Sequence, residues 1–238
     1  MWGSDTMRLT CKLGPVVAAA MSAGLLATAC GGTSAPANSQ TKTAGDVVPK
    51  MLSAVKSAKS VHMTGTTMSG SQTITFDMSF YGNSDMFGTF GDGSGKFSML
   101  LTGAKMYVKA NRAFLKLAHV PARACATMCG KYIKLPASAA GQFAGSLSMS
   151  TISTKAFGNI SASDAKDASK NLVPASFNGQ PVLKLSTGNY TFEVAGTGTP
   201  YPVLVKAPDG TQVVFSQWNA VKAPAPPPAS KVLDTGQI

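Results

Sequence analysis

The segment Thr73–Phe80 reads TITFDMSF, and it sets the architecture expected for the rest of the chain. Its apolar side chains alternate strictly with polar ones, which is the period of a β-strand with one buried and one wet face. The sequence Gly82-Asn83-Ser84-Asp85 follows and interrupts the pattern. We therefore predict a strand over residues 73–80 that turns its polar side, including Asp77, to water.

Short strands are expected on both sides of this segment, because apolar stretches of strand length are separated by glycine-containing turns. Two later turns, Thr187-Gly188-Asn189 and Pro208-Asp209-Gly210, have hairpin composition. Many short strands joined by tight turns predict an antiparallel meander. The further expected strands are residues 61–68, 86–90, 96–101, 105–110, 131–135, 181–186, 190–195, 202–207 and 211–218.

Helical spacing of apolar residues is found outside the meander. Residues 46–59 place Val48, Met51 and Val55 on one side of a predicted helix, with Pro49 in its first turn. Residues 137–157 are small and polar with scattered large apolar side chains, which predicts one or two loosely specified helices. A further short helix is expected over 163–171, and residues 113–130 are expected to be irregular.

The first 30 residues resemble the export signal of a bacterial lipoprotein. Arg8 and Lys12 precede an uncharged apolar run, and small residues lead up to Cys30. In lipoproteins the cysteine of such a lipobox receives a diacylglycerol, and the chain is cut just before it. The resemblance implies lipid attachment at Cys30 and a location on the extracytoplasmic face of the cell membrane. A simple secretion signal and a transmembrane helix are the alternatives.

Composition divides the chain into four parts. Residues 1–29 are the expected signal peptide, and residues 30–45, rich in Gly, Ser, Thr and Ala, are an expected flexible tether. Residues 46–223 are long enough for a single domain with its own core. Residues 224–238 begin with a Pro-rich run and form an expected C-terminal tail.

The net charge of +11 does not indicate a nucleic-acid-binding protein here, because an exported protein has little access to nucleic acid. Only 13% of residues are charged, so we expect the positive excess to be spread thinly. No basic helix and no alternation of basic and aromatic residues is present. A dilute positive surface suits anionic lipids and polymers of a cell envelope, or it simply provides solubility. We expect a monomer with no nucleic-acid partner.

The residues that could support catalysis are few. The chain has two histidines, and its only glutamate is Glu193, which alternates with apolar neighbours and is expected to face water. The Gly-x-Ser-x-Gly motif of hydrolases is absent from the sequence. Ser-x-x-Lys matches such as those at Ser53 and Ser163 lack the partner Lys-Thr-Gly motif. We therefore expect a non-enzymatic protein with no cofactor.

Cys125 and Cys129 form the most specific local motif of the domain. In an oxidising compartment this pair predicts a small disulfide in an exposed loop, which would stabilise the fold by about 2 kcal/mol. The alternative is a soft-metal site, because Met128 between the cysteines and His119 upstream would complete a ligand set that favours Cu(I).

The order of these elements resembles actinobacterial lipoproteins of the LppX/LprG type, which share the LolA-like fold. The likeness is carried by short strand phrases that span most of the domain. These phrases are AKSVHMTG at 58–65, TGAKMYVK at 102–109, GKYIKL at 130–135, GQPV at 179–182 and PYP at 200–202.

This resemblance implies an α+β fold in which a strongly curved antiparallel sheet, a half-barrel, has helices covering its concave face. In relatives the enclosed space holds acyl chains of lipids or lipoglycans that are carried across the envelope, which implies a lipid ligand and an envelope transport partner. The same apolar residues could instead fill a packed core in a ligand-free structural or sensory domain. The expected wall of the lipid-binding cavity is Ile74, Phe76, Met78, Phe80, Phe97, Met99 and Leu101.

Overall fold

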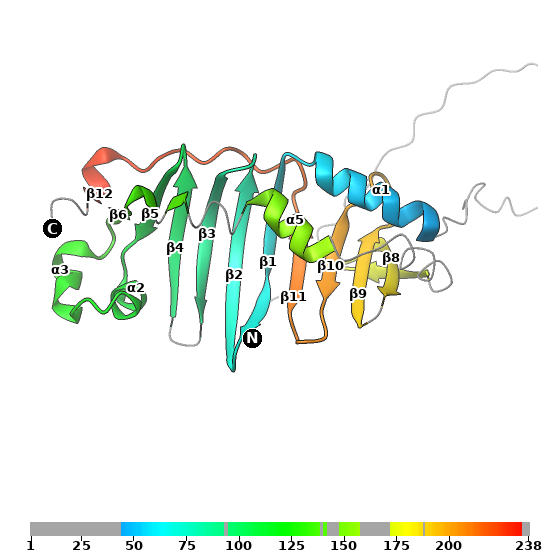
Figure 1. Ribbon diagram of the computed structural model, residues 1–238, viewed down its shortest axis with the longest axis horizontal. Helices are drawn as coiled ribbons and strands as arrows, with labels where there is room; N and C mark the ends of the chain where they lie inside the picture. Colours follow the sequence, from blue (N-terminus) through cyan, green and yellow to red (C-terminus); the bar gives the residue numbers. More distant parts are fainter. Residues whose placement is uncertain are drawn as a thin grey trace, which may run out of the picture. The chain divides into compact units, whose positions relative to one another are not determined.

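The computed structural model describes residues 44–92, 95–138, 140–141, 148–157, 172–187 and 189–234. The expected signal peptide, Cys30, nearly all of the expected tether and the expected helix at 163–171 lie outside the described residues. The described part of the chain contains one twelve-stranded sheet with helices on one face and at one end (Figure 1).

Neighbouring strands run in the order β12-β6-β5-β4-β3-β2-β1-β11-β10-β9-β8-β7. Every pairing is antiparallel except that of β12 with β6, which is parallel. The mostly antiparallel sheet predicted from the alternating segments is thus confirmed. The strands are β1 (Ser60–Ser69), β2 (Gln72–Tyr81), β3 (Asp85–Asp92), β4 (Gly95–Thr102), β5 (Lys105–Lys109), β6 (Tyr132–Lys134), β7 (Val173–Phe177), β8 (Gln180–Thr187), β9 (Tyr190–Ala195), β10 (Pro202–Lys206), β11 (Gln212–Ser216) and β12 (Val232–Asp234).

The strong curvature of a half-barrel is not found, and this part of the expectation is corrected. The sheet is open, with β12 and β7 at its two edges, and it is not strongly curled (Figure 1). Strong bending usually requires β-bulges, each of which shifts the register of a strand. Among the described pairings, the register shifts only between Pro202 and Leu204 in β10.

Two helices pack on one face of the sheet, which we call the helix-covered face. They are α1 (Ala44–Ser57) and α5 (Met149–Phe157), both joined to the sheet in one apolar core. Helix α1 begins two residues earlier than expected, so Pro49 lies beyond its first turn. Val48, Met51 and Val55 are buried on the predicted side of this helix.

Further helical turns lie near β4, β5 and β6 (Figure 1). They are α2 (Arg112–Leu117), the 3-10 turn η1 (Ala122–Ala124) and α3 (Cys125–Met128). The segment 113–130, expected to be irregular, is therefore largely helical. Another 3-10 turn, η3 (Ala229–Lys231), precedes β12.

The core between the helices and the sheet is rich in methionine. Seven of the chain's 12 methionines belong to the buried cluster. Methionine is unbranched and flexible, so it fills irregular space and can repack around a variable neighbour. These seven are Met51, Met63, Met78, Met86, Met99, Met106 and Met149.

The chain crosses the ends of several strands after β11. The amide of Val221 donates to the Ser60 hydroxyl at 3.2 Å, and the Thr102 hydroxyl donates to the Pro224 carbonyl at 3.3 Å. Residues 224–228 carry no strand, in keeping with their prolines. The chain then returns to the sheet, where β12 pairs with β6.

Candidate functional site

The seven residues expected to line a cavity lie on one face of the sheet, because the strand registers align them in rows. Phe76 of β2 lies opposite Phe90 of β3, which in turn lies opposite Phe97 of β4. Two further rows are Met78–Gly88–Met99 and Phe80–Met86–Leu101. Their neighbours in the core show that this is the helix-covered face.

Burial divides the seven residues into two groups. Met78, Phe80, Met99 and Leu101 are at most 4% exposed and belong to the buried core. Ile74, Phe76 and Phe97 are only half-buried. The rows thus become progressively less covered toward the end of the sheet that holds Ile74. Whether these residues bind a lipid stays a prediction.

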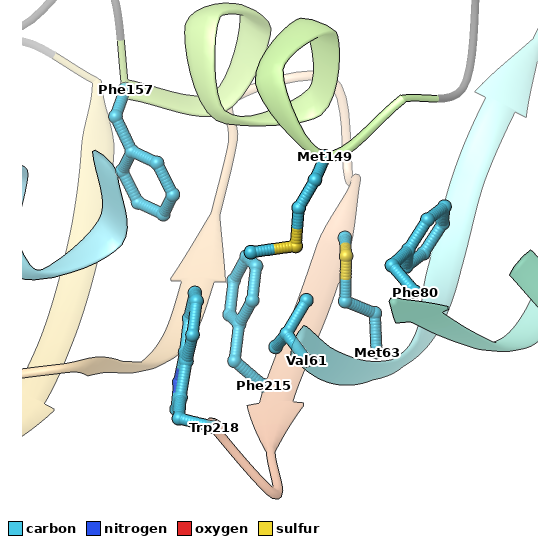
Figure 2. A pocket seen from close by; sticks show the side chains of 7 residues that line it. All are labelled: Val61, Met63, Phe80, Met149, Phe157, Phe215 and Trp218. Carbon is cyan, nitrogen blue, oxygen red and sulfur yellow. The ribbon is translucent and has the colours of Figure 1, made fainter. Parts of the chain in front are cut away.

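The space beneath α5 is almost filled. Figure 2 shows Met149 and Phe157 pointing from this helix toward the sheet. The cavity between them has a volume of about 10 Å³, close to the minimum that a single water molecule needs. With an apolar lining and so little room, this region acts as packed core. The lining residues are Val61, Met63, Phe80, Met149, Phe157, Phe215 and Trp218.

A larger apolar hollow lies beside α2, and we call it the α2 hollow. It has a volume of about 190 Å³, and Ile74, Phe90, Phe97 and Leu117 supply its large apolar side chains. Leu117 is 63% exposed, so the hollow has an apolar residue open to solvent. The rest of its lining is Gln72, Gly91, Asp92, Gly95 and Ala113.

Helix α2 is fixed against the sheet by the side chain of Asn111. Its Oδ1 accepts from the Phe114 amide at 2.9 Å, which caps the helix, and its Nδ2 donates to the Lys96 carbonyl at 2.7 Å. The Phe114 ring then packs at 5.9 Å from the ring of Phe97. These contacts give the α2 hollow one rigid wall.

Helix α2, which forms one wall of this hollow, was not predicted from the sequence. The one signal that could have revealed it was a cap residue followed by apolar positions, Asn111 before Phe114 and Leu115. A helix of six residues is too short to show a period of its own.

A second groove lies on the opposite face of the sheet. It has a volume of about 420 Å³ and runs between β3, β4 and the Pro-rich segment. Phe87 and Leu100 provide apolar surface there, while Thr89 and Ser98 provide hydroxyl groups. Pro224 and Ala225 form the side contributed by the segment that follows β11.

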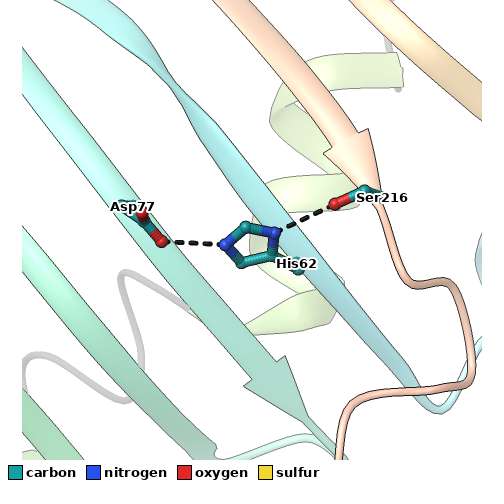
Figure 3. Close-up of polar contacts among 3 residues, drawn as sticks. All are labelled: His62, Asp77 and Ser216. Carbon is teal, nitrogen blue, oxygen red and sulfur yellow. Dashed lines mark hydrogen bonds and ion pairs between the residues drawn. The ribbon is translucent and has the colours of Figure 1, made fainter. Parts of the chain in front are cut away.

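His62, Asp77 and Ser216 form a hydrogen-bonded row across three adjacent strands (Figure 3). The imidazole Nε2 lies 2.8 Å from the Asp77 Oδ1, and Nδ1 lies 2.9 Å from the Ser216 hydroxyl. In hydrolase triads the nitrogens are used the other way round. None of the three residues lines a described cavity. Asp77 is 62% exposed, as predicted for its face, so the row links strands on a wet surface.

We expect His62→Ala to lower the free energy of unfolding by about 1 kcal/mol, because it removes two hydrogen bonds that are partly exposed to water. Chemical denaturation of the purified protein measures this change. Ser216→Ala, which removes only the hydroxyl, should cost less. A loss above about 3 kcal/mol in His62→Ala would contradict the role of a surface link.

Glu193 departs from the expectation that it faces water. Its Oε2 is buried and has no hydrogen-bond partner, although the side chain as a whole is only half-buried. The residue lies opposite Lys184 in the pairing of β8 with β9. The strand alternation identified the face correctly, but the neighbouring side chains on that face cover part of the carboxylate.

The predicted disulfide between Cys125 and Cys129 is present. The two cysteines flank one turn of α3, and their Cα atoms are 4.7 Å apart, a separation suited to a disulfide. Both sulfurs are therefore used, whereas a soft metal needs free thiolates. Within the described residues, His, Cys, Asp and Glu form no group of three that could hold a metal ion.

No helix in the described part of the chain combines the length and the apolar character needed to cross a membrane.

Comparison with known proteins identifies the fold. No family model and no curated protein matches the chain. Among solved structures, LprF from Mycobacterium bovis superposes with a TM-score of 0.50 at 14% identity, over 77% of this chain and 96% of that one. The lipoprotein LppX from Mycobacterium tuberculosis gives 0.45 at 17%, over 76% of this chain and 98% of that one. The likeness to LprF confirms the fold resemblance that the sequence phrases indicated, apart from the strong sheet curvature corrected above.

Proposed function

We propose that this chain is an envelope lipoprotein that binds an acyl chain of a lipid or lipoglycan, and that the α2 hollow receives that chain. The observation that carries the proposal is the hollow itself. Its large side chains are aliphatic or aromatic, and one of them is largely exposed. The fold shared with LprF, the lipobox-like sequence ending at Cys30 and the envelope lipoproteins that the sequence resembles support the same function.

An acyl chain suits the α2 hollow because burial of methylene groups needs no directional partner, only apolar surface. Small-molecule sites usually measure about 300–1,000 Å³. At about 190 Å³, the hollow takes only part of a long chain. The polar Gln72 on its lining provides a place for a headgroup.

A longer chain would have to continue along the helix-covered face. Strand β2 provides the path, since Ile74 lines the α2 hollow and Phe80 lines the small cavity beneath α5, with Phe76 and Met78 between them. Flexible methionines next to this path allow the core to repack around an inserted chain. Binding would then require α5 to move away from the sheet.

The test of this proposal is a charge placed inside the α2 hollow. Ile74→Asp should weaken binding of a long-chain fluorescent fatty acid at least tenfold, because the chain would have to displace water from a carboxylate. The half-buried position allows the fold to persist, which circular dichroism and thermal melting verify. Titration of the ligand into the purified protein measures the effect.

Thr73→Asp is the matched control, because the adjacent residue is exposed and points to the opposite face of β2. This variant should bind the fatty acid as the wild type does. Equal affinities for Ile74→Asp and Thr73→Asp would exclude the α2 hollow as the binding site. A wild-type protein without measurable affinity would overturn the proposed function.

A further inference from the structure

Positive charge is concentrated at one end of the sheet, contrary to the expectation that it is spread thinly. Residues 95–134 contain eight of the chain's 21 lysines and arginines and none of its 10 acidic residues. This segment supplies β4, β5, α2, η1, α3 and β6, which lie together in Figure 1. Strand β12 adds one acidic residue, Asp234, at this end through its pairing with β6, and the excess of positive charge there remains.

The cations around α2 surround exposed apolar surface. Arg112 and Lys116 are one helical turn apart, and both are exposed. Arg123 is exposed on η1, which contacts α2. Leu117, 63% exposed, lies next to Lys116 in this group.

We propose that this surface, formed by Arg112, Lys116, Leu117 and Arg123, docks on an anionic lipid bilayer. We call it the α2 docking surface. Lipid phosphates pair with the guanidinium and ammonium groups, and Leu117 enters the apolar boundary of the bilayer. Cationic and apolar residues side by side on a short helix are the combination that interfacial helices use.

The exposed leucine favours a bilayer over a soluble polyanion. A polyanion would pair with the cations but would leave Leu117 in water. The bilayer satisfies both parts of the surface. One acidic residue, Asp92, lies on the lining of the neighbouring α2 hollow and is half-buried. It leaves the three exposed cations, Arg112, Lys116 and Arg123, in the majority.

Docking goes beyond the proposed lipid binding and does not depend on it. It would bring the exposed Leu117 side of the α2 hollow to the bilayer, which is where an acyl chain would enter. A protein that docks but takes up no fatty acid would disprove the proposed function alone. A protein that takes up fatty acid but shows no preference for anionic vesicles would disprove docking alone.

The experiment uses the full chain with Cys30→Ser, so that no acyl anchor contributes. Flotation compares vesicles of phosphatidylcholine with vesicles that also contain phosphatidylglycerol. The leader carries Arg8 and Lys12 and contributes equally in the wild type and in every variant, so the readout is the change that each variant makes in the preference for anionic vesicles. We expect a clear preference that weakens as salt is raised.

The triple variant Arg112→Glu, Lys116→Glu, Arg123→Glu should lower this preference at least tenfold. The matched control reverses three exposed lysines elsewhere, Lys50, Lys184 and Lys206, for the same change in net charge. The control should retain most of the preference. An equal loss in both variants would mean that overall charge alone drives binding, and it would overturn the proposal.

Leu117→Ser tests the apolar part of the α2 docking surface without changing its charge. We expect a severalfold loss of binding to anionic vesicles with the preference for them retained. Unchanged binding would overturn the insertion of Leu117. Displacement of the protein from anionic vesicles by soluble polyphosphate at matched phosphate concentration would overturn the bilayer as the partner.

Discussion

Met78→Asp is expected to unfold the protein. Met78 is 4% exposed and lies between Met63 of β1 and Gly88 of β3, within the core beneath the helices. A carboxylate buried there without a partner costs several kcal/mol, against a total stability of about 5–15 kcal/mol for a typical domain. Thermal and denaturant melting should show no cooperative transition, or one at a much lower midpoint.

Met78→Leu provides the control, since it conserves volume and polarity and should cost less than about 1.5 kcal/mol. A stable Met78→Asp protein would show that water reaches this row of the sheet. The helix-covered face would then be an open cavity at Met78 as well as at Ile74. The same variant therefore separates a packed core from a continuous cavity.

The strands could largely be predicted from the sequence, because their signals are local. The alternation in Thr73–Phe80 is reproduced in β2, where Ile74, Phe76, Met78 and Phe80 face the helices. The predicted wet side is only partly wet, because Ser79 is buried. The turns at 187–189 and 208–210 join the expected pairs of strands. At the second turn, Asp209 accepts from the Thr211 amide at 2.9 Å, which lowers the pKa of its carboxyl group. Turn chemistry of this kind acts within a few residues.

The elements that were missed depend on distant partners or are very short. Strand β12 has three residues, and it is a strand because it meets β6 after the chain has crossed the strand ends. Strand β7 was not predicted, and it contains Pro174, which an edge strand tolerates. The curvature of the sheet could not be predicted from the sequence either, because it depends on strand register and β-bulges rather than on the apolar pattern.

The sequence predicted which face of the sheet the candidate residues occupy, but not how deeply each of them is buried. Side chains alternate between the two faces of a strand, and the strand registers place all seven predicted residues on the same face, the helix-covered one. The alternation does not show which helix, if any, covers each of these residues. Phe80 lies beneath α5, whereas Ile74 and Phe97 line the α2 hollow. The positions of two short helices determine which rows are filled.

Phe157→Ala is expected to produce the second large effect, because it loosens the helix that closes the core. Phe157 is 3% exposed, and its ring centroid lies 5.7 Å from that of Phe215 and 6.2 Å from that of Phe192. Truncation of a buried phenylalanine costs about 3–5 kcal/mol. In a protein of this size that loss should lower Tm by about 10 °C, which scanning calorimetry measures.

The same change should enlarge the cavity of about 10 Å³ beneath α5, because Phe157 forms part of its lining. Apolar cavities of this kind stay dry and take up small apolar molecules. If an acyl chain reaches this region when α5 moves, Phe157→Ala should bind the fluorescent fatty acid more tightly than the wild type despite its lower stability. Phe157→Leu, which keeps most of the buried volume, should be intermediate in both properties. Lower stability with unchanged or weaker fatty-acid binding would confine the ligand to the α2 hollow and exclude the path beneath α5.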